Sequence, residues 1–170
     1  MARLTPLPVE LTPVLAQRRR TVAGRADGRV LDLGDWTDHL EAYPVADVRH
    51  CTSPDEIEAG ATFDTIVSLV RTPLVNDLPT YVDTLLAMLA PEGRLAFLDP
   101  VCRPGRGGRA LALAGRVART AGGLHLDRDL PRELREHGLI VADLHRFEVP
   151  STSAPFRPFV EAWARRPITP

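Results

Sequence analysis

The side chains best suited to chemistry stand near the ends of short apolar runs. Asp32 lies in RVLDLG, Asp99 in AFLDP, and His125 in GLHLDR. A carboxylate at a strand end either binds a ligand or is held by the chain itself, because a buried charge needs partners in both cases. A histidine, with a reference pKa of about 6.5, can take a proton from a hydroxyl or a thiol. His125 is therefore a weak candidate for a catalytic residue, beside the plainer interpretation of a solvated loop side chain.

The other reactive residue types exclude several kinds of site. All 21 basic residues are arginine, so no lysine is present to form a Schiff base. Cys51 and Cys102 are too few and too far apart for a disulfide framework or a C-x-x-C motif, and we expect both to be reduced. Four further histidines show no metal-ligand spacing, so we predict no metal site and no carboxylate–histidine cluster: His39, His50, His137 and His145.

Composition is typical of one globular domain, with 170 residues of which 44% are hydrophobic and 25% charged. The net charge of −1 creates no overall field that would recruit nucleic acid. The apolar runs fall short of the roughly 18 residues of a membrane span, and the first residues lack the pattern of a signal peptide. We therefore expect a cytoplasmic protein with no nucleic-acid partner and no membrane span, and the arginine bias indicates a GC-rich bacterial genome.

The elements that must position these residues alternate between strand and helix. Residues 1–12 predict an extended arm, followed by one domain over residues 13–170. The first helix, over 13–25, carries Arg18, Arg19 and Arg20, which we expect on a solvated face. Strands are predicted over 29–33, 45–50, 63–70, 94–100, 139–149 and 159–165, and further helices over 78–93, 110–120 and 130–138, the last one capped by Asp129. This order predicts an α/β fold with a largely parallel sheet.

Four segments, in this order, resemble the class I S-adenosylmethionine-dependent methyltransferases that act on small molecules. They are RVLDLG, FDTIVS, LAPEGRLAFLDP, and the tail from GLHLDRDL to FVEAWARR. The resemblance runs from about Gly28 to Arg166. It implies an abbreviated Rossmann-like, mostly parallel sheet flanked by helices, with the last two strands antiparallel. It also implies methyl transfer from S-adenosylmethionine to a small-molecule acceptor, at a site beyond the carboxyl ends of the strands.

The resemblance implies a cofactor site made by Asp32, Gly34, Asp35, Trp36 and Ser68. In the family, an acid at the position of Asp32 holds the amino group of the cofactor, directly or through water. Two of the three glycines in the family's G-x-G-x-G turn are replaced here, by Trp36 and Asp38. The indole would fill the space of the methionine and ribose portions, although capping or packing is the simpler interpretation of both replacements.

The connection after this turn is also short. From Gly34 to Asp64 there are 30 residues, where the family places three crossovers and a single one takes roughly 30. We therefore predict that a strand and its helix are missing on the side that holds adenosine. The acid that family members carry at the end of the second strand has no clear counterpart in VADVRHCTS.

Two functions remain open from the sequence. The first is methyl transfer with impaired cofactor binding, where in-line positioning supplies the acceleration and no dedicated catalytic residue is needed. The second is an inactive methyltransferase-like scaffold that acts through a protein partner or a copy of itself. Four roles remain open for the arginine-rich segment 103–119. It could cover the sheet with its arginines in water, clamp an anionic substrate, lie on an anionic membrane surface, or act as a lid.

Overall fold

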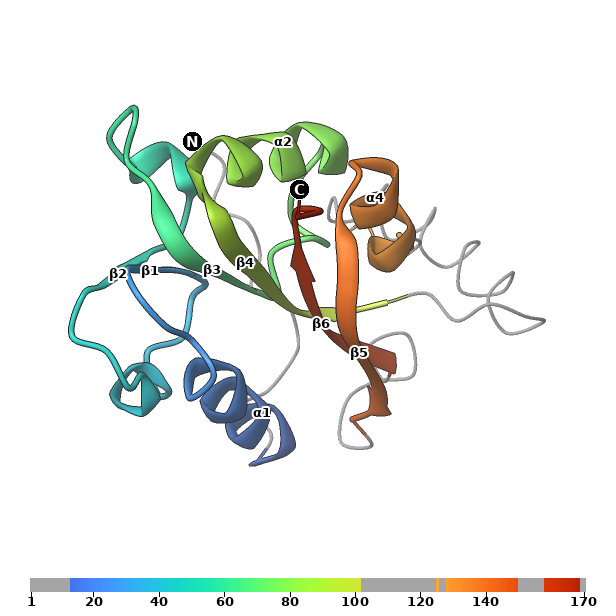
Figure 1. Ribbon diagram of the computed structural model, residues 1–170. Coiled ribbons are helices and arrows are strands. Elements are labelled where there is room, and N and C mark those ends of the chain that lie inside the picture. The colour runs from blue at the N-terminus through green and yellow to red at the C-terminus, as the bar shows by residue number, and fades with distance from the viewer. Residues whose placement is uncertain (1–12, 102–124, 126–127, 150–157, 169–170) are drawn as a thin grey trace.

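A single six-stranded sheet forms the centre of the protein (Figure 1). The computed structural model describes residues 13–101, 125, 128–149 and 158–168. The sheet has the order β2-β1-β3-β4-β6-β5 and consists of β1 (Val30–Leu33), β2 (Val48–Cys51), β3 (Phe63–Leu69), β4 (Leu89–Pro100), β5 (Ile140–Glu148) and β6 (Pro158–Arg165). β1 to β4 are parallel to one another, whereas β6 runs antiparallel to both β4 and β5. The predicted α/β class, with antiparallel final strands, is confirmed.

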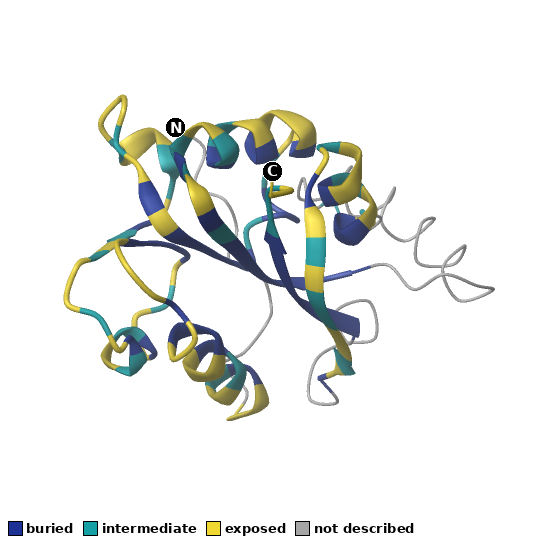
Figure 2. Ribbon diagram, viewed as in Figure 1, coloured by how far each residue is buried: buried dark blue, intermediate teal, exposed yellow. Residues whose placement is uncertain are grey.

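Helices cover both faces of the sheet (Figure 1). α1 (Pro13–Ala23) and the 3-10 turn η1 (Leu40–Ala42) lie on one side, and α2 (Leu78–Met88) and α4 (Leu130–Glu136) lie on the other. A second 3-10 turn, η2 (Pro54–Glu56), follows β2. Successive side chains of a strand point to opposite faces. β3, β4 and β6 are therefore mostly buried along their length, as the dark blue strands of Figure 2 show.

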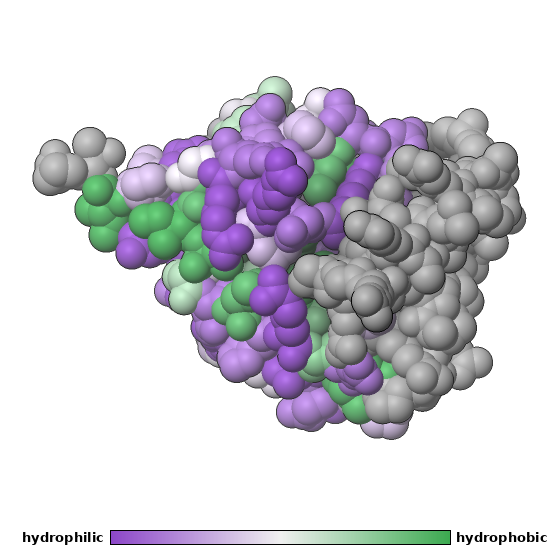
Figure 3. Space-filling model, turned by 90° about the vertical axis from the view of Figure 1, so that its right-hand side faces the viewer, coloured by the Kyte–Doolittle hydropathy of each residue, from purple (hydrophilic) through white to green (hydrophobic). Residues whose placement is uncertain are grey.

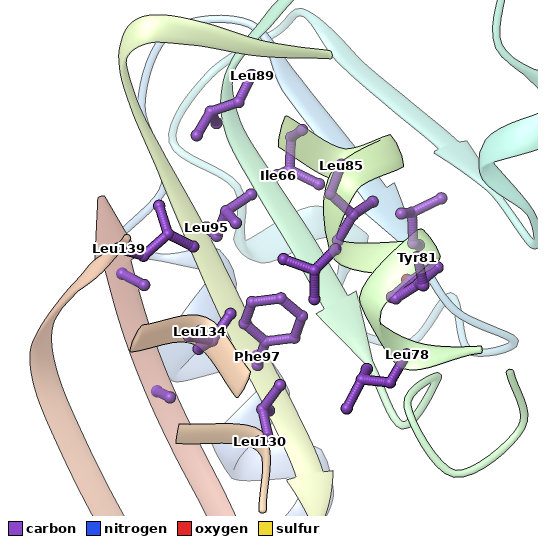
Figure 4. Close-up of a cluster of buried hydrophobic side chains, with 14 of the residues drawn as sticks. Ile66, Leu78, Tyr81, Leu85, Leu89, Leu95, Phe97, Leu130, Leu134 and Leu139 are labelled. Carbon is purple, nitrogen blue, oxygen red and sulfur yellow. The ribbon is translucent and has the colours of Figure 1, made fainter. Parts of the chain in front are cut away.

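The larger apolar cluster fills the space between the sheet and the helices α2 and α4. Figure 4 shows Leu85 of α2 and Leu134 of α4 on either side of Phe97, which projects from β4. These three side chains are inaccessible to solvent. Burying apolar surface stabilises the fold by about 25 cal/mol per Å², so this layer fixes the position of β4 and its carboxyl end.

Local signals in the sequence explain where the helices begin and end. The Asp77 carboxylate accepts a hydrogen bond from the backbone N–H of Thr80 and caps α2. The predicted cap of α4 is confirmed, because Asp129 accepts a hydrogen bond from the N–H of Arg132. α4 ends before Gly138, which has a φ of 74° that glycine adopts without strain.

β4 is longer than predicted and begins directly after α2. Within the stretch 78–93 the sequence predicts a helix that Pro91 and Gly93 stop, followed by a strand over 94–100, whereas the helix ends at Met88 and the strand starts at Leu89. The pairing with β3 is irregular at that point, since Phe63 pairs with Leu89 and Thr65 with Arg94. An inserted stretch containing Pro91 and Gly93 therefore bulges out of the ladder before the regular strand begins.

The connection from β1 to β3 is abbreviated, as predicted. Residues 34–62 contain one strand, β2, and two 3-10 turns, with no α-helix. β2 is consequently an edge of the sheet, and β5 is the opposite edge. Figure 3 shows the side of the molecule to the right in Figure 1, where hydrophilic side chains cover most of the described surface. No helix in the described part of the chain is long and apolar enough to cross a membrane.

Candidate functional site

The carboxyl ends of the parallel strands meet along one edge of the sheet. Leu33 of β1 pairs with Cys51 of β2 on one side and with Ser68 of β3 on the other. β4 lies beside β3 in the same direction. Residues at these strand ends can act on one ligand, because open parallel sheets bind ligands beyond this edge.

Asp32 is at the centre of a buried polar cluster on the α1 side of this edge. Its side chain is fully buried, and both carboxylate oxygens are engaged. Oδ2 lies 2.7 Å from Nε2 of His39 and also accepts a hydrogen bond from the hydroxyl of Tyr43. Oδ1 lies 2.7 Å from Nδ1 of His50, which is the register partner of Asp32 in β2. Because a carboxylate only accepts hydrogen bonds, the ring nitrogens that face it carry hydrogens.

The partners of Asp32 differ in their exposure. His39 and Tyr43 are buried, whereas the side chain of His50 is 24% exposed. Burial, followed by the negative charge of Asp32, raises the pKa of Tyr43 above its ordinary value. Tyr43 therefore remains a hydrogen-bond donor at any physiological pH.

The absence of a carboxylate–histidine cluster was predicted, and the structure shows that this prediction is wrong. His39 and His50 reach the same carboxylate from a 3-10 turn and from a neighbouring strand. Even so, in the described residues no group of three or more His, Cys, Asp or Glu side chains could hold a metal ion. The pairing of two parallel strands in register was the signal that could have found the Asp32–His50 contact.

Gly34 and Asp35 follow β1 and face the end of β3. A Cβ atom on Gly34 would come within 3.2 Å of the Leu69 side chain, so the close approach of these two strand ends requires a small residue. Oδ1 of Asp35 accepts a hydrogen bond of 3.1 Å from Nη1 of Arg71. This ion pair joins the segment after β1 to the segment after β3.

Trp36 and Asp38, at the positions of the replaced glycines, both contact Arg19 of α1. The guanidinium carbon of Arg19 lies 4.9 Å from the centre of the indole ring, and Trp36 packs against the apolar cluster on the α1 side. Asp38 accepts three hydrogen bonds of 2.8–3.1 Å from Arg19. Burial alone would raise the pKa of Asp38, but the hydrogen bonds and charge of Arg19 outweigh it and lower the pKa. Both residues therefore have internal contacts of the kind that the capping or packing interpretation expects.

Arg19 itself corrects a prediction. The three consecutive arginines were expected on a solvated face, yet the Arg19 side chain is only 1% exposed. It shares the buried stripe of α1 with Leu15 and Val22. A buried guanidinium needs a charged partner, and Asp38 supplies one.

Ser68 belongs to a second polar group, on the α2 side of the sheet. Its hydroxyl lies 3.0 Å from the hydroxyl of Tyr81, a residue that the sequence did not single out. Burial raises the pKa of Tyr81 above its ordinary value. Ser68 is fully buried, so its hydroxyl is committed to this internal contact.

Asp99 is the penultimate residue of β4, lies on the same side of the sheet and is fully buried. Its Oδ1 atom accepts a hydrogen bond of 3.1 Å from the backbone N–H of Thr72. Its Oδ2 atom has no hydrogen-bond partner among the residues that the structure describes. Burial is the largest influence and raises the pKa of Asp99 to about 7.

His125 lies against the loop that follows β3. Its backbone N–H donates to the carbonyl of Pro73 at 2.8 Å. Arg128 holds the same loop by donating to the carbonyls of Thr72 and Asn76. His125 is therefore brought near the carboxyl edge of the sheet, and its catalytic role stays a prediction. The arginine-rich segment 103–119 lies outside the described residues.

Val70 is strained at the same edge. It has a φ of 53°, in the left-handed region that β-branched residues rarely adopt. Its backbone N–H donates to the carbonyl of Leu98 at 2.8 Å, which holds the turn after β3 in place. Strain of this kind is concentrated where a fold shapes a site.

Comparisons with known proteins find the fold and no sequence relative. No protein-family model and no curated protein matches the chain. Among solved structures, the N-methyltransferase NodS from Bradyrhizobium japonicum WM9 in complex with S-adenosylhomocysteine matches with a TM-score of 0.62 and 15% identity, over 98% of this chain and 94% of that one. A putative methyltransferase from Bacillus halodurans C-125 matches with a TM-score of 0.60 and 12% identity, over 90% and 99% of the two chains.

A third structure with this fold is the 4+2 cyclase SpnF, with a TM-score of 0.64 and 16% identity, over 91% of this chain and 81% of that one. At such identities a likeness shows the fold and not the activity. The sheet order, the antiparallel final strands and these likenesses together show that the chain has the class I methyltransferase-like fold, in a form shortened between β1 and β3.

Proposed function

We propose that this chain is a methyltransferase-like protein in which S-adenosylmethionine binding is impaired. The observation that carries the proposal is that both carboxylate oxygens of Asp32 already have hydrogen-bond partners within the chain. The family resemblance gives this carboxylate the amino group of the cofactor as its ligand, yet here both of its oxygens are bonded to His39, Tyr43 and His50. A ligand would have to displace one of these donors from a fully buried position.

In the segment after β2, the carboxylate of Glu56 is bonded within its own turn, so it would have to leave these contacts to serve as the family's ribose-binding acid. Glu56 accepts hydrogen bonds at 2.8–3.0 Å from the backbone and hydroxyl of Thr52 and from the backbone of Ser53. These hydrogen bonds lower the pKa of Glu56, and the one from the Thr52 hydroxyl has the largest effect. Cys51 is buried, and burial raises the pKa of its thiol to about 11. The polar groups at the end of β2 therefore stabilise their own turn.

The Asp35–Arg71 ion pair supports the same conclusion from the other side of the edge. Asp35 is 57% exposed and Arg71 is 13% exposed, so the pair lies at the surface between the ends of β1 and β3. A cofactor that ran along these strand ends would have to separate the two charges. An internal contact accounts for the residue type at each position of the predicted cofactor site, without a ligand: Asp32, Gly34, Asp35, Trp36 and Ser68.

A scaffold function is the second candidate, and the edge strand β2 favours it. β2 has four residues and pairs only with β1 among the described strands. An edge strand presents backbone hydrogen-bonding groups that can pair with a strand from another chain. A protein partner or a second copy of this chain is the occupant that such an edge accepts.

Thermal unfolding with S-adenosylmethionine and S-adenosylhomocysteine tests the proposal. A ligand present at one hundred times its dissociation constant stabilises the folded state by about 2.7 kcal/mol. We expect no rise in the melting temperature of this protein at about 1 mM of either ligand. NodS, which crystallised with S-adenosylhomocysteine, should show a clear rise with that ligand. A rise in this protein that saturates with ligand concentration would overturn the proposal and restore methyl transfer to a small molecule as the function.

A further inference from the structure

We propose that His50 is a proton acceptor held in position by Asp32, and that the pair forms an acid–base site for a small-molecule hydroxyl group. This site goes beyond the proposed function, because its chemistry does not use S-adenosylmethionine, although it shares Asp32 with the cofactor site that the resemblance implies. It concerns a histidine for which the sequence analysis predicts no role. His50 lies on the edge strand β2, and its side chain is 24% exposed.

The backbone places the two residues face to face. Asp32 and His50 are register partners in adjacent parallel strands, so their side chains point to the same side of the sheet. Oδ1 of Asp32 lies 2.7 Å from Nδ1 of His50. The carboxylate is fully buried, while the histidine side chain is 24% exposed. One end of the ring is thus anchored and the side chain still reaches solvent.

The hydrogen bond selects the tautomer of His50. Because the carboxylate of Asp32 can only accept, Nδ1 carries the hydrogen, and in the neutral ring Nε2 then holds a free lone pair. A proton taken up at Nε2 creates an imidazolium next to the Asp32 charge, which stabilises it. Two further donors, His39 and Tyr43, occupy the other oxygen of Asp32 and fix the orientation of the carboxylate.

Three other histidines, His39, His137 and His145, each lack one part of this arrangement. His39 shares the carboxylate but is fully buried, so it cannot meet a substrate. His145 is 61% exposed, but it faces Asp143 through Nε2 at 3.5 Å, and Asp143 is already paired with Arg25. His137 is bonded through Nδ1 to a backbone carbonyl of its own helix, that of Glu133. His50 combines a buried carboxylate partner with an accessible ring.

The proton transfer needs no further reactant. The O–H bond of the hydroxyl compound breaks, its proton forms a bond to Nε2 of His50, and the electron pair stays on the oxygen. That oxygen is then a stronger nucleophile. With water as the hydroxyl compound and p-nitrophenyl acetate as the electrophile, the oxygen attacks the ester carbonyl, p-nitrophenolate leaves and acetic acid forms. Acetic acid and the protonated Nε2 then each release one proton to solvent.

Two measurements test the inference. Long-range ¹H–¹⁵N correlation spectra of the wild-type protein should show neutral His50 with its hydrogen on Nδ1, and a hydrogen on Nε2 would overturn the proposal. Hydrolysis of p-nitrophenyl acetate should fall at least about a hundredfold in His50→Gln, the lower end of what general acid–base catalysis supplies. The matched control is His145→Gln, which removes a more exposed histidine whose Nε2, and not its Nδ1, faces a carboxylate, and which should keep the wild-type rate.

Asp32→Asn tests whether Asp32 orients the ring of His50 or only stabilises the fold. If it folds, the Nδ1 preference of His50 should be lost together with the hydrolysis rate, and an unchanged tautomer would contradict the positioning role. If it does not fold, His50→Gln still decides, since a rate equal to that of the wild type would overturn the proposal. Neither readout contains S-adenosylmethionine, so failure here is distinct from failure of the proposed function.

Discussion

Nδ1 of His50 lies 2.7 Å from Oδ1 of Asp32, although 18 residues separate them in the sequence. The contact exists because β2 runs parallel to β1 with these two residues in register. It gives the buried carboxylate a partner from its own chain, at the position where the family resemblance expects a ligand. The same contact underlies the proposed loss of cofactor binding and the proposed role of His50.

Asp32→Asn is expected to lower the free energy of unfolding by about 2 kcal/mol or more, because an amide turns a donor toward one of the groups that now donate to Asp32. Urea denaturation followed by circular dichroism measures the change. The matched control is Asp47→Asn, whose side chain is 70% exposed and pairs with Arg29 at 3.6 Å. It should cost less than about 0.5 kcal/mol. Equal costs for the two variants would show that the cluster around Asp32 does not hold.

Asp38→Ala is expected to destabilise the protein by about 2–3 kcal/mol, because it leaves the buried guanidinium of Arg19 without its charged partner. The figure is below that of a fully buried pair, since Asp38 is 31% exposed and water can enter. Chemical denaturation of the single variant and of Arg19→Met/Asp38→Ala measures it. The double variant should be more stable than the two single losses in free energy of unfolding, those of Arg19→Met and Asp38→Ala, would give when added. A double variant whose loss equals that sum would contradict the pairing.

Asp99→Asn should remove a pH dependence of stability. Burial raises the pKa of Asp99 from 3.8 to about 7, so between these values the unfolded chain has lost a proton that the folded chain keeps. The free energy of unfolding therefore falls as the pH rises from about 4 to about 7, and it levels off above that. A shift of about 3 pKa units corresponds to roughly 4 kcal/mol.

Urea titrations of wild type and Asp99→Asn across this pH range give the comparison, because all other groups are common to both proteins. The difference in stability between the variant and the wild type should grow with pH in favour of the asparagine. A difference that stays constant with pH would mean that Asp99 is ionised in the folded protein.

Gly28→Ala is expected to lower the free energy of unfolding by more than about 2 kcal/mol. About 1 kcal/mol comes from backbone strain, and the rest comes from the collision of the new Cβ with the Asp64 side chain. Gly28 has a φ of 64°, and a Cβ there would lie 2.3 Å from Oδ2 of Asp64. Asp64 cannot easily move away, since it accepts a hydrogen bond from the N–H of Arg29 at 2.8 Å. Thermal denaturation compares this variant with Gly60→Ala, where φ is 84° and the surroundings are open. A cost for Gly28→Ala no larger than that for Gly60→Ala would argue against the close contact.

The sequence predicted the elements well because their signals are local. The continuous apolar run of β3, the cap at Asp129, and the short interval between β1 and β3 each depend on neighbouring residues. Arg19 could also have been placed, because it stands four residues after Leu15 and three before Val22, on the same face of the helix. Three consecutive arginines obscured that spacing.

The cluster around Asp32 was out of reach for a different reason. His39 and Tyr43 come from a connection whose family counterpart is an α-helix, but which here forms only a 3-10 turn. No periodicity predicts which side chains such a turn directs inward. Ser68 was placed in a cofactor site because of its strand, whereas its partner Tyr81 comes from α2 through packing between distant layers.

Isothermal titration calorimetry of the purified protein with S-adenosylhomocysteine tests most directly whether the internal contacts of Asp32 have replaced cofactor binding. No saturable heat is expected up to millimolar ligand, while NodS, titrated in parallel, should bind. Saturable heat with a micromolar dissociation constant, about −8 kcal/mol, would contradict the central proposal and show that a ligand displaces the partners of Asp32.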